Sequence, residues 1–247
     1  MTGSILPLRV KGLTYQPGTR RLVDGISFEL TAGLRTVILG PNGAGKSLTL
    51  RLCHGLIPPS AGHIVWGDGN IPPAYRTRRQ AMVFQKPVML RRSTAANISH
   101  ALACHGVKRR DRPARVAEAL ARTGLEALAR TPARVLSSGE QQRLALARAW
   151  ILRPEIMFLD EPTASLDPAS TRSVEDIILA IHHAGTKIIL TTQNLGQARR
   201  LADEILFLDR GRLVEHASAE DFFAGPATPE ARAFISGELI TQEKTHV

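Results

Sequence analysis

A glycine-rich loop set between a predicted strand and a predicted helix constrains the fold of this chain more than any other feature. Residues 40–47 read Gly-Pro-Asn-Gly-Ala-Gly-Lys-Ser and match the pattern G-x-x-x-x-G-K-[S/T]. An apolar stretch, Arg35 to Leu39, leads into the loop, and a helical pattern follows from Ser47 to Gly55. A strand, a glycine-rich loop and a helix in this order predict the beginning of an α/β nucleotide-binding fold.

The residue types of this loop suit the binding of phosphate groups. Glycines let successive backbone N–H groups turn inward around a phosphate, where side chains would collide. Lys46 adds a positive charge for the β- and γ-phosphates, and the following helix points its positive end at them. The Ser47 hydroxyl is placed to coordinate Mg²⁺. The loop therefore predicts a site for nucleotide phosphates and magnesium.

Two carboxylates follow an apolar run at residues 156–159, where Asp160 and Glu161 end a predicted strand. Ligands of open α/β sheets bind at the carboxyl ends of the strands. We expect Asp160 to hold the metal, directly or through water, and Glu161 to polarise the attacking water. A strand that ends in two acids is on its own equally consistent with a solvated strand end. The phosphate loop favours the catalytic interpretation.

A serine-rich segment, Leu136 to Arg143, precedes an apolar helical stretch from Leu144 to Leu152. Ser137, Ser138 and Gly139 lie where a helix begins, and the free N–H groups and hydroxyls there can bind an anion. The alternative is an ordinary serine N-cap supported by Glu140 in the first turn. Taken by itself, the segment favours this alternative.

The order of predicted elements indicates an α/β domain with a helical insertion. From about Ser93 to Ala133 the residues Ala, Leu, Arg and Glu dominate, and residues 114–122 have helical periodicity. Buried β-branched runs suggest parallel central strands where the α/β pattern returns. The predicted strands are Gly25–Leu30, Arg35–Leu39, His63–Trp66, Glu155–Asp160, Thr186–Thr191 and Leu213–Glu215. One or two small helices are expected beyond about Ser218.

Composition leaves several binding partners open. The formal net charge of +10 suits nucleic acid, phosphates or an anionic membrane surface, and equally suits dispersed arginines that keep exposed helices in solution. Aromatic residues make up 4% of the chain, which gives little support for stacking on single-stranded bases. The two cysteines argue against a disulfide framework and favour a reducing compartment such as the cytoplasm.

Taken together, these motifs make the chain resemble the nucleotide-binding subunits of ABC transporters over nearly its whole length. They occur in the order of that family: the phosphate loop, an isolated Gln85 after a strand, the signature segment at 136–140, the Asp160-Glu161 pair, the loop at 164–167 and a polar switch after Thr191. The combination is far more specific than any one motif.

The resemblance implies an α/β fold: a P-loop NTPase core with a parallel central sheet, an N-terminal antiparallel β subdomain and an inserted all-helical subdomain. We expect a single domain over residues 1–247. Its nucleotide-binding core is expected at 1–85 and 154–247, and the helical insertion with the signature at 86–153.

The resemblance also implies ATP and Mg²⁺ as cofactors and a head-to-tail homodimer that holds two ATP molecules at its interface. Ser137 and Gly139 of one copy would reach the γ-phosphate held by the other. Further partners are two membrane permease subunits and, indirectly, a substrate-binding receptor, on the cytoplasmic face of the plasma membrane; no nucleic acid is expected. The nucleotide contacts carried over from the family are Tyr15, Gly40, Pro41, Asn42, Gly43, Ala44, Gly45, Lys46, Ser47, Leu48, Gln85, Ser137, Ser138, Gly139 and Asp167.

Individual roles follow from the same resemblance. Tyr15 would stack on adenine, although a tyrosine on a strand also commonly fills the core. Gln85 would join Ser47 and Asp160 at the metal and signal to the permease. Asp167 would contact the phosphate loop of the partner.

The chain departs from the usual family pattern at several positions. Ser138 replaces a glycine, and Glu140 replaces a glutamine and adds negative charge near an anion site. The switch residue is Gln193 rather than histidine, and Asn194 follows it. A glutamine can donate a hydrogen bond to a γ-phosphate oxygen but cannot carry an imidazolium charge. We assign Gln193 a catalytic role with slower hydrolysis; the alternative is a natural equivalent with near-normal turnover.

Two stretches, residues 79–93 and 195–203, most resemble subunits of oxyanion importers, the tungstate type in particular, and residues 234–237 are similar to the related phosphate importers. The cargo expected from this resemblance is tungstate, molybdate or phosphate. Three alternatives stay open: the ATPase of another ABC transporter, a soluble ABC ATPase that acts on nucleic acid or ribosomes, and an unrelated P-loop kinase.

Overall fold

The computed structural model describes residues 3–237, so both ends of the expected domain, residues 1–2 and 238–247, lie outside the described part. The chain forms two compact units, and each is built from separate segments. The described part of the first unit comprises residues 3–8, Thr31–Gly33 and Trp66–Leu190. The described part of the second comprises Arg9–Leu30, Leu34–Val65 and residues 191–237. The division into a core and a helical insertion stays a prediction.

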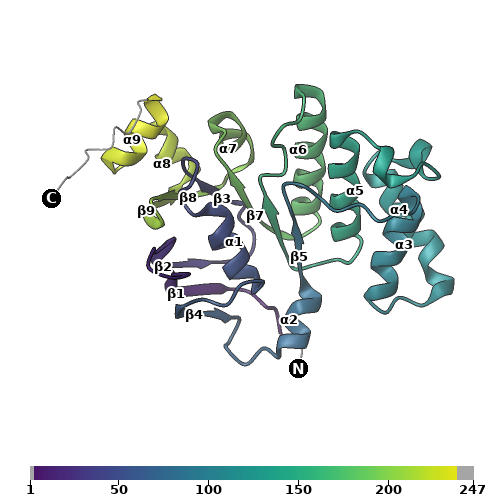
Figure 1. Cartoon of the computed structure of the whole chain (residues 1–247), viewed down its shortest axis with the longest axis horizontal. Helices are drawn as coiled ribbons and strands as arrows, with labels where there is room; N and C mark the ends of the chain where they lie inside the picture. Colours follow the sequence, from purple (N-terminus) through teal and green to yellow (C-terminus); the bar gives the residue numbers. More distant parts are fainter. Residues whose placement is uncertain (1–2, 238–247) are drawn as a thin grey trace. The chain divides into compact units, whose positions relative to one another are not determined.

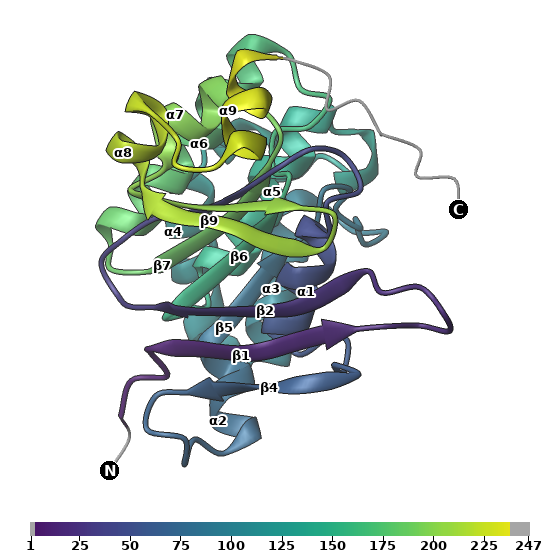
Figure 2. The same ribbon diagram turned by 90° about the vertical axis from the view of Figure 1, so that its left-hand side faces the viewer.

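The second unit contains a three-stranded antiparallel sheet in the order β2-β1-β4 (Figure 2). Its strands are β1 (Leu8–Tyr15), β2 (Val23–Leu30) and β4 (Ala61–Trp66), of which Leu8 and Trp66 themselves belong to the first unit. Buried and exposed residues alternate along much of β2, as expected for a strand with one face on the core. This sheet is the antiparallel β subdomain that the family resemblance predicts.

The same unit contains three strands in the order β3-β8-β9, namely β3 (Thr36–Leu39), β8 (Glu204–Asp209) and β9 (Arg212–Ser218). β3 and β8 are parallel, and β8 and β9 are antiparallel. Arg35 fixes the start of this pair, because its guanidinium donates to both Asp203 carboxylate oxygens, at 2.9 and 2.7 Å. The helices are α1 (Lys46–His54), α7 (Leu195–Leu201), α8 (Ala219–Ala224) and α9 (Pro229–Ser236).

The carboxylate of Glu215 on β9 holds the turn that leads into α9. It accepts hydrogen bonds from the backbone N–H groups of Ala227 and Thr228, both at 3.0 Å, and from the Thr228 hydroxyl at 2.8 Å. Burial alone would raise the pKa of Glu215, but these hydrogen bonds outweigh it, and the pKa lies below its ordinary value. The ring of Phe207 on β8 packs beside Phe234 on α9, with centroids 5.3 Å apart.

The first unit contains β5 (Gln80–Val83), β6 (Ile156–Asp160) and β7 (Lys187–Thr192), whose residues up to Leu190 belong to it. They neighbour one another in the order β5-β6-β7, and β5 and β6 are parallel. Every residue of β6 is buried, and its residues 156–159 are fully inaccessible. Burying such side chains contributes about 1.5–3 kcal/mol each.

The helices of this unit are α2 (Pro73–Arg79), α3 (Thr94–Cys104), α4 (Arg112–Arg122), α5 (Ser138–Trp150) and α6 (Pro168–His183). α3, α4 and α5 pack against one another (Figure 1, teal), and α5 also packs against α6. The prediction of an α/β fold with a helical region is therefore confirmed. No helix in the described residues is long and apolar enough to cross a membrane.

The predicted elements are present in the structure. β3 and β8 are parallel, as are β5 and β6, and the edge strand β9 is antiparallel to β8, so the sheet is mixed. The helix α5 begins at Ser138, where the serine segment predicts a helix start, and Ser137 is its N-cap. No residue range was predicted for the strands β1, β5 and β8 or for the helices α2, α6 and α7.

Some of the arginines that give the chain its positive charge have structural contacts. Arg79 pairs with Glu155 and lies 4.5 Å from the ring centroid of Tyr75, and Arg76 lies 5.9 Å from that of Trp66. These arginines stabilise the packing of α2, and their charge therefore needs no separate partner to explain it.

Candidate functional site

The phosphate loop leads directly into α1, within the second unit. Gly40, Gly43 and Gly45 have φ values of 154°, 79° and 94°, which a glycine adopts most easily. Gly45 is the N-cap of α1, and the first turn of α1 has neither a side-chain cap nor an acidic residue. The N-terminus of α1 is therefore suited to bind an anion.

Two of these glycines are needed for close backbone contacts. A Cβ on Gly40 would lie 2.1 Å from the carbonyl oxygen of Leu208 on β8. A Cβ on Gly45 would lie 3.0 Å from the carbonyl oxygen of Leu22. The loop thus lies directly against neighbouring backbone, and side chains at these positions would push it out of place.

Lys46 is buried in this loop, with 5% of its surface exposed. Its Nζ donates to the carbonyl oxygens of Gly40 at 2.9 Å and Pro41 at 3.0 Å. The ammonium group is thus held over the loop, where it can meet a phosphate oxygen. Ser47 and Leu48 are half-buried in the first turn of α1, and Asn42 is exposed.

The two carboxylates lie at the end of β6 in the first unit, as predicted. Asp160 is buried, and Glu161 leaves the strand with a left-handed φ of 44°, which is unusual for a residue with a side chain. Gln85 follows the parallel strand β5, and its Nε2 donates to Glu161 Oε2 at 3.4 Å. The structure thus brings together Gln85 and Glu161, which are far apart in the sequence.

The signature segment forms the cap of α5. The Ser137 hydroxyl accepts from the Glu140 backbone N–H at 3.3 Å and is 2.9 Å from the Glu140 carboxylate, which also accepts from the Ser137 N–H at 2.8 Å. This is the capping box that we considered as the alternative. Ser137 and Ser138 remain exposed at the helix start, whereas Gly139 is buried.

Glu140 therefore has a defined structural role in this signature. The Ser137 backbone N–H and then its side chain hold the pKa of Glu140 below its ordinary value, and the charge of Arg143 adds to this effect.

Asp167 is exposed at the start of α6 and caps it. One carboxylate oxygen accepts from the backbone N–H groups of Ala169 at 2.9 Å and Ser170 at 3.0 Å. Hydrogen bonds from the side chain and then the backbone of Ser170 hold the pKa of Asp167 below its ordinary value. Ser165, just before it, has a left-handed φ of 64°.

The remaining predicted residues lie in the second unit. Tyr15 is half-buried at the last position of β1, a setting compatible with both interpretations of it. Gln193 is exposed directly after β7. Asn194 caps α7 by accepting from the Gln197 backbone N–H at 2.9 Å, a role that a short polar residue before a helix could have revealed.

Sequence reasoning missed Arg148 of α5, which holds the segment that follows Gln85. Its guanidinium donates to the Val88 carbonyl oxygen at 2.9 Å and approaches Asn97 Oδ1 at 3.5 Å. Asn97 Oδ1 in turn accepts from the Leu90 N–H at 3.1 Å. An arginine among the apolar residues of a helix was the available signal.

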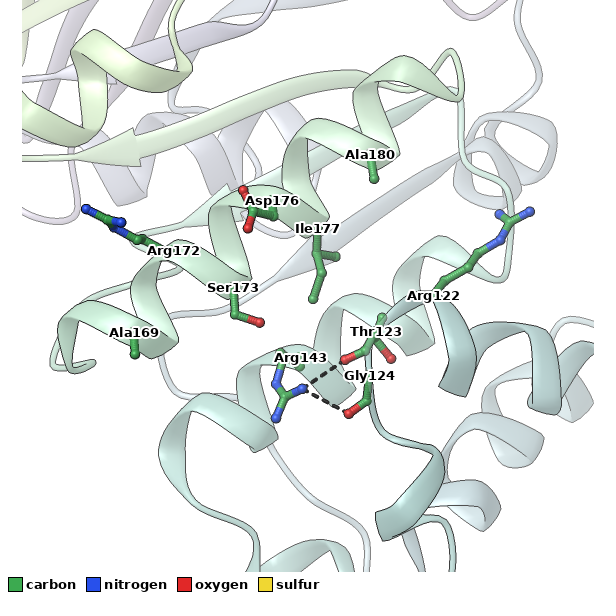
Figure 3. A pocket seen from close by; sticks show the side chains of 10 residues that line it. All are labelled: Arg122, Thr123, Gly124, Arg143, Ala169, Arg172, Ser173, Asp176, Ile177 and Ala180. Atoms are coloured by element: carbon green, nitrogen blue, oxygen red, sulfur yellow. Dashed lines mark hydrogen bonds between the residues drawn. The ribbon is translucent and has the colours of Figure 1, made fainter.

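A groove of about 520 Å³ lies between α6 and the end of α4 and α5 (Figure 3). Arg143 forms one wall and donates to the carbonyl oxygens of Thr123 at 3.1 Å and Gly124 at 3.0 Å. Arg122 and Arg172 lie at opposite ends of the groove. None of the predicted site residues lines it, so it is distinct from the phosphate loop and the carboxylates.

The chain matches the family model described as ABC transporter over residues 23–164. It is 36% identical over 231 residues to the methionine import ATP-binding protein MetN of Caulobacter vibrioides, covering 90% of this chain and 69% of that protein. It is 33% identical over 246 residues to the L-cystine transport system ATP-binding protein TcyN of Escherichia coli, covering 94% of this chain and 98% of that protein.

Solved structures show the same fold. The structure of cbiO1 from Clostridium perfringens, part of the ABC transporter complex cbiONQ, matches with a TM-score of 0.79 at 28% identity, over 88% of this chain and 90% of that chain. An ATP-binding subunit of an ABC transporter matches with a TM-score of 0.80 at 24% identity, over 94% and 99%. With the phosphate loop and the carboxylates of β6, the family model and the two relatives show that the chain belongs to the ABC transporter family and is an ATP-binding, Mg²⁺-dependent ATPase whose hydrolysis is coupled to transport.

Proposed function

We propose that this chain is the ATP-hydrolysing subunit of an importer and that two copies act together beneath separate permease subunits. The observation that carries the proposal is the phosphate loop, in which a buried lysine ammonium is held on the loop carbonyls and α1 begins without a side-chain cap. The names of the two relatives, both ATP-binding proteins of import systems, support the direction of transport.

The residues that we propose as Mg²⁺ ligands have side chains suited to that ion. Mg²⁺ prefers hard oxygen ligands and is usually bound by one or two carboxylates together with substrate phosphates. Ser47, Gln85 and Asp160 supply a hydroxyl, an amide and a carboxylate. When bound, the ion neutralises charge on the β- and γ-phosphates.

The remaining groups of the chain act on the phosphates and on water. Lys46 binds phosphate oxygens, and the N–H groups of the loop orient them. Glu161, held by Gln85, polarises the attacking water and accepts its proton. Gln193 donates a hydrogen bond to the γ-phosphate, and Tyr15 stacks on adenine.

The signature and Asp167 act on the nucleotide bound by the second copy. Ser137, Ser138 and Asp167 are exposed at the starts of α5 and α6, which leaves them accessible to a partner. Two such sites form in a head-to-tail homodimer, and hydrolysis then depends on closure of that dimer.

The permease contacts the segment after Gln85 together with the helical region, on the inner face of the plasma membrane. Val88 and Val135 are 73% and 71% exposed, unusually high for apolar side chains. Arg134 Nε donates to the Met89 carbonyl oxygen at 3.4 Å, which connects the two segments. Cross-linking from Val88→Cys to a co-expressed permease tests this contact, and Leu34→Cys, also exposed, is the control.

For the cargo we propose an oxyanion, tungstate above molybdate or phosphate, on the basis of residues 79–93 and 195–203. A second candidate is an amino acid, because the two relatives are named for methionine and L-cystine. The ATPase subunit does not contact the cargo in the proposed arrangement, so an uptake assay is needed to distinguish the oxyanion from the amino acid.

The ATPase proposal is tested with the purified chain. Lys46→Ala should lower kcat about 100-fold or more, since it removes the charge at the transferred phosphoryl group. Glu161→Gln should abolish turnover but retain ATP binding. The matched controls, Lys11→Ala and Glu126→Gln, change exposed residues and should keep the native rate. A native rate in Lys46→Ala would refute the assignment.

The importer proposal is tested by uptake of labelled tungstate, molybdate, phosphate, methionine and cystine in cells with and without this gene. Loss of uptake of one solute, restored by the native chain but not by Lys46→Ala, identifies the cargo. Loss of methionine or cystine uptake alone would refute the oxyanion proposal, and unchanged uptake of all five would refute both cargo proposals.

A further inference from the structure

The helices α5 and α6 meet at their first turns, within the first unit. Gly139 of the signature faces Ser170, so closely that a Cβ on Gly139 would lie 2.5 Å from the Ser170 hydroxyl oxygen and 2.8 Å from its Cβ. Such distances leave no space for any side chain at position 139 unless a helix moves. The start of the signature helix therefore lies directly on Ser170.

The same serine also binds Asp167. Its backbone N–H donates to the Asp167 carboxylate at 3.0 Å, and its side chain forms a second hydrogen bond to that aspartate. Hydrogen bonds to a charged acceptor are stronger than those between neutral groups. Ser170 is thus in contact with Gly139 on one side and hydrogen-bonded to Asp167 on the other.

Further along the two helices the packing is interrupted. The groove of Figure 3 separates α6 from Arg143 and the Thr123–Gly124 turn, and Ser173, one turn beyond Ser170, lines this groove. Ser173 therefore offers a side chain of the same chemistry on the same helix, facing the groove instead of Gly139.

We propose that Ser170 is a positioning residue that sets the signature and Asp167 relative to each other, so that both motifs reach the nucleotide of the partner copy together. The inference rests on the proposed roles of Gly139 and Asp167 in the dimer. Ser170 acts through the Asp167 carboxylate and through its contact with Gly139. The Ser170 hydroxyl holds the Asp167 carboxylate, and the small Ser170 side chain lets the start of α5 pack closely against α6.

The test is a double-mutant cycle of Ser170→Ala with Asp167→Ala, measured by steady-state ATPase kinetics. Ser170→Ala removes the hydroxyl and keeps the small size, so the fold should be retained. We expect kcat to fall about fivefold with KM for ATP unchanged within about twofold, because a charge-assisted hydrogen bond is lost from the catalytic step alone. In the Asp167→Ala background the same substitution should change kcat by less than about 1.5-fold.

Two further measurements separate positioning from stability. Ser173→Ala is the control and should retain native kcat and melting temperature. ATP-dependent dimerisation in the Glu161→Gln background, followed by light scattering, should keep its ATP midpoint within about twofold after Ser170→Ala, and the melting temperature should stay unchanged within about 2 °C.

Three outcomes would overturn the proposal: native kcat in Ser170→Ala, an equal loss in both Asp167 backgrounds, or a loss that follows a lowered melting temperature. Inactivity of the native chain or full activity of Lys46→Ala would instead refute the proposed ATPase site. The two failures are therefore distinguishable.

Discussion

Replacing Gly40 by alanine tests the backbone geometry of the phosphate loop most directly. The new Cβ would lie 2.1 Å from the Leu208 carbonyl oxygen and 3.3 Å from the Ala44 Cβ. The φ of 154° at this position is also strained for any residue with a side chain. Gly43→Ala is the matched control, because Gly43 has a positive φ of 79° but no neighbouring atom within 4 Å of the added Cβ.

The expected magnitudes follow from these two geometries. Gly43→Ala forces alanine into a left-handed conformation, at about 1–2 kcal/mol. Gly40→Ala adds an overlap that is relieved only if the loop or β8 moves by roughly 1 Å, so strain of about 1–3 kcal/mol and overpacking of about 1–3 kcal/mol both apply. We expect a total near 4 kcal/mol for Gly40→Ala, a large part of the stability of an ordinary domain.

Thermal unfolding provides the measurement. For a chain of this size, 1 kcal/mol corresponds to a shift of about 2–4 °C in melting temperature. Gly40→Ala should therefore lower the melting temperature by about 8–16 °C and Gly43→Ala by about 2–8 °C, with ATP absent in both cases. Equal melting temperatures for the two variants would refute the close approach of the loop to β8.

Three other predictions concern turnover, pH and thiol reactivity. Gln193→His should raise kcat roughly tenfold if a proton-carrying side chain speeds the step, whereas an unchanged rate would contradict slower hydrolysis by the native chain. The pKa of Glu215 is lowered on folding, so the ionised carboxylate stabilises the fold above the ordinary glutamate range near pH 4, and this stabilisation is lost as the pH falls below that range. Glu215→Gln should therefore make the free energy of unfolding in urea depend less steeply on pH in the acid range. An unaltered pH dependence would count against the assigned hydrogen bonds. Burial raises the pKa of the Cys53 thiol to about 12, whereas Cys104 is exposed. A maleimide should therefore label one thiol of the native protein at neutral pH and two thiols after denaturation. Rapid labelling of both thiols in the native protein would contradict the burial of Cys53.

Local patterns were sufficient to predict much of this protein. The phosphate loop was predictable because its pattern and the glycines of its tight backbone turn stand within eight consecutive residues. The carboxylates of β6 were predictable because an apolar run ends directly at Asp160. The family followed from the order of such motifs along the chain.

Contacts between segments far apart in the sequence could not be predicted in this way. The Ser137 segment was compatible with both a helix cap and an anion site, and the structure shows the cap while leaving both serines exposed. Nothing in the signature reveals that Gly139 lies against Ser170, or that Gln85 donates to Glu161. Such contacts depend on how helices and strands pack, and the packing is set by burial of side chains over the whole domain rather than by neighbours in the chain.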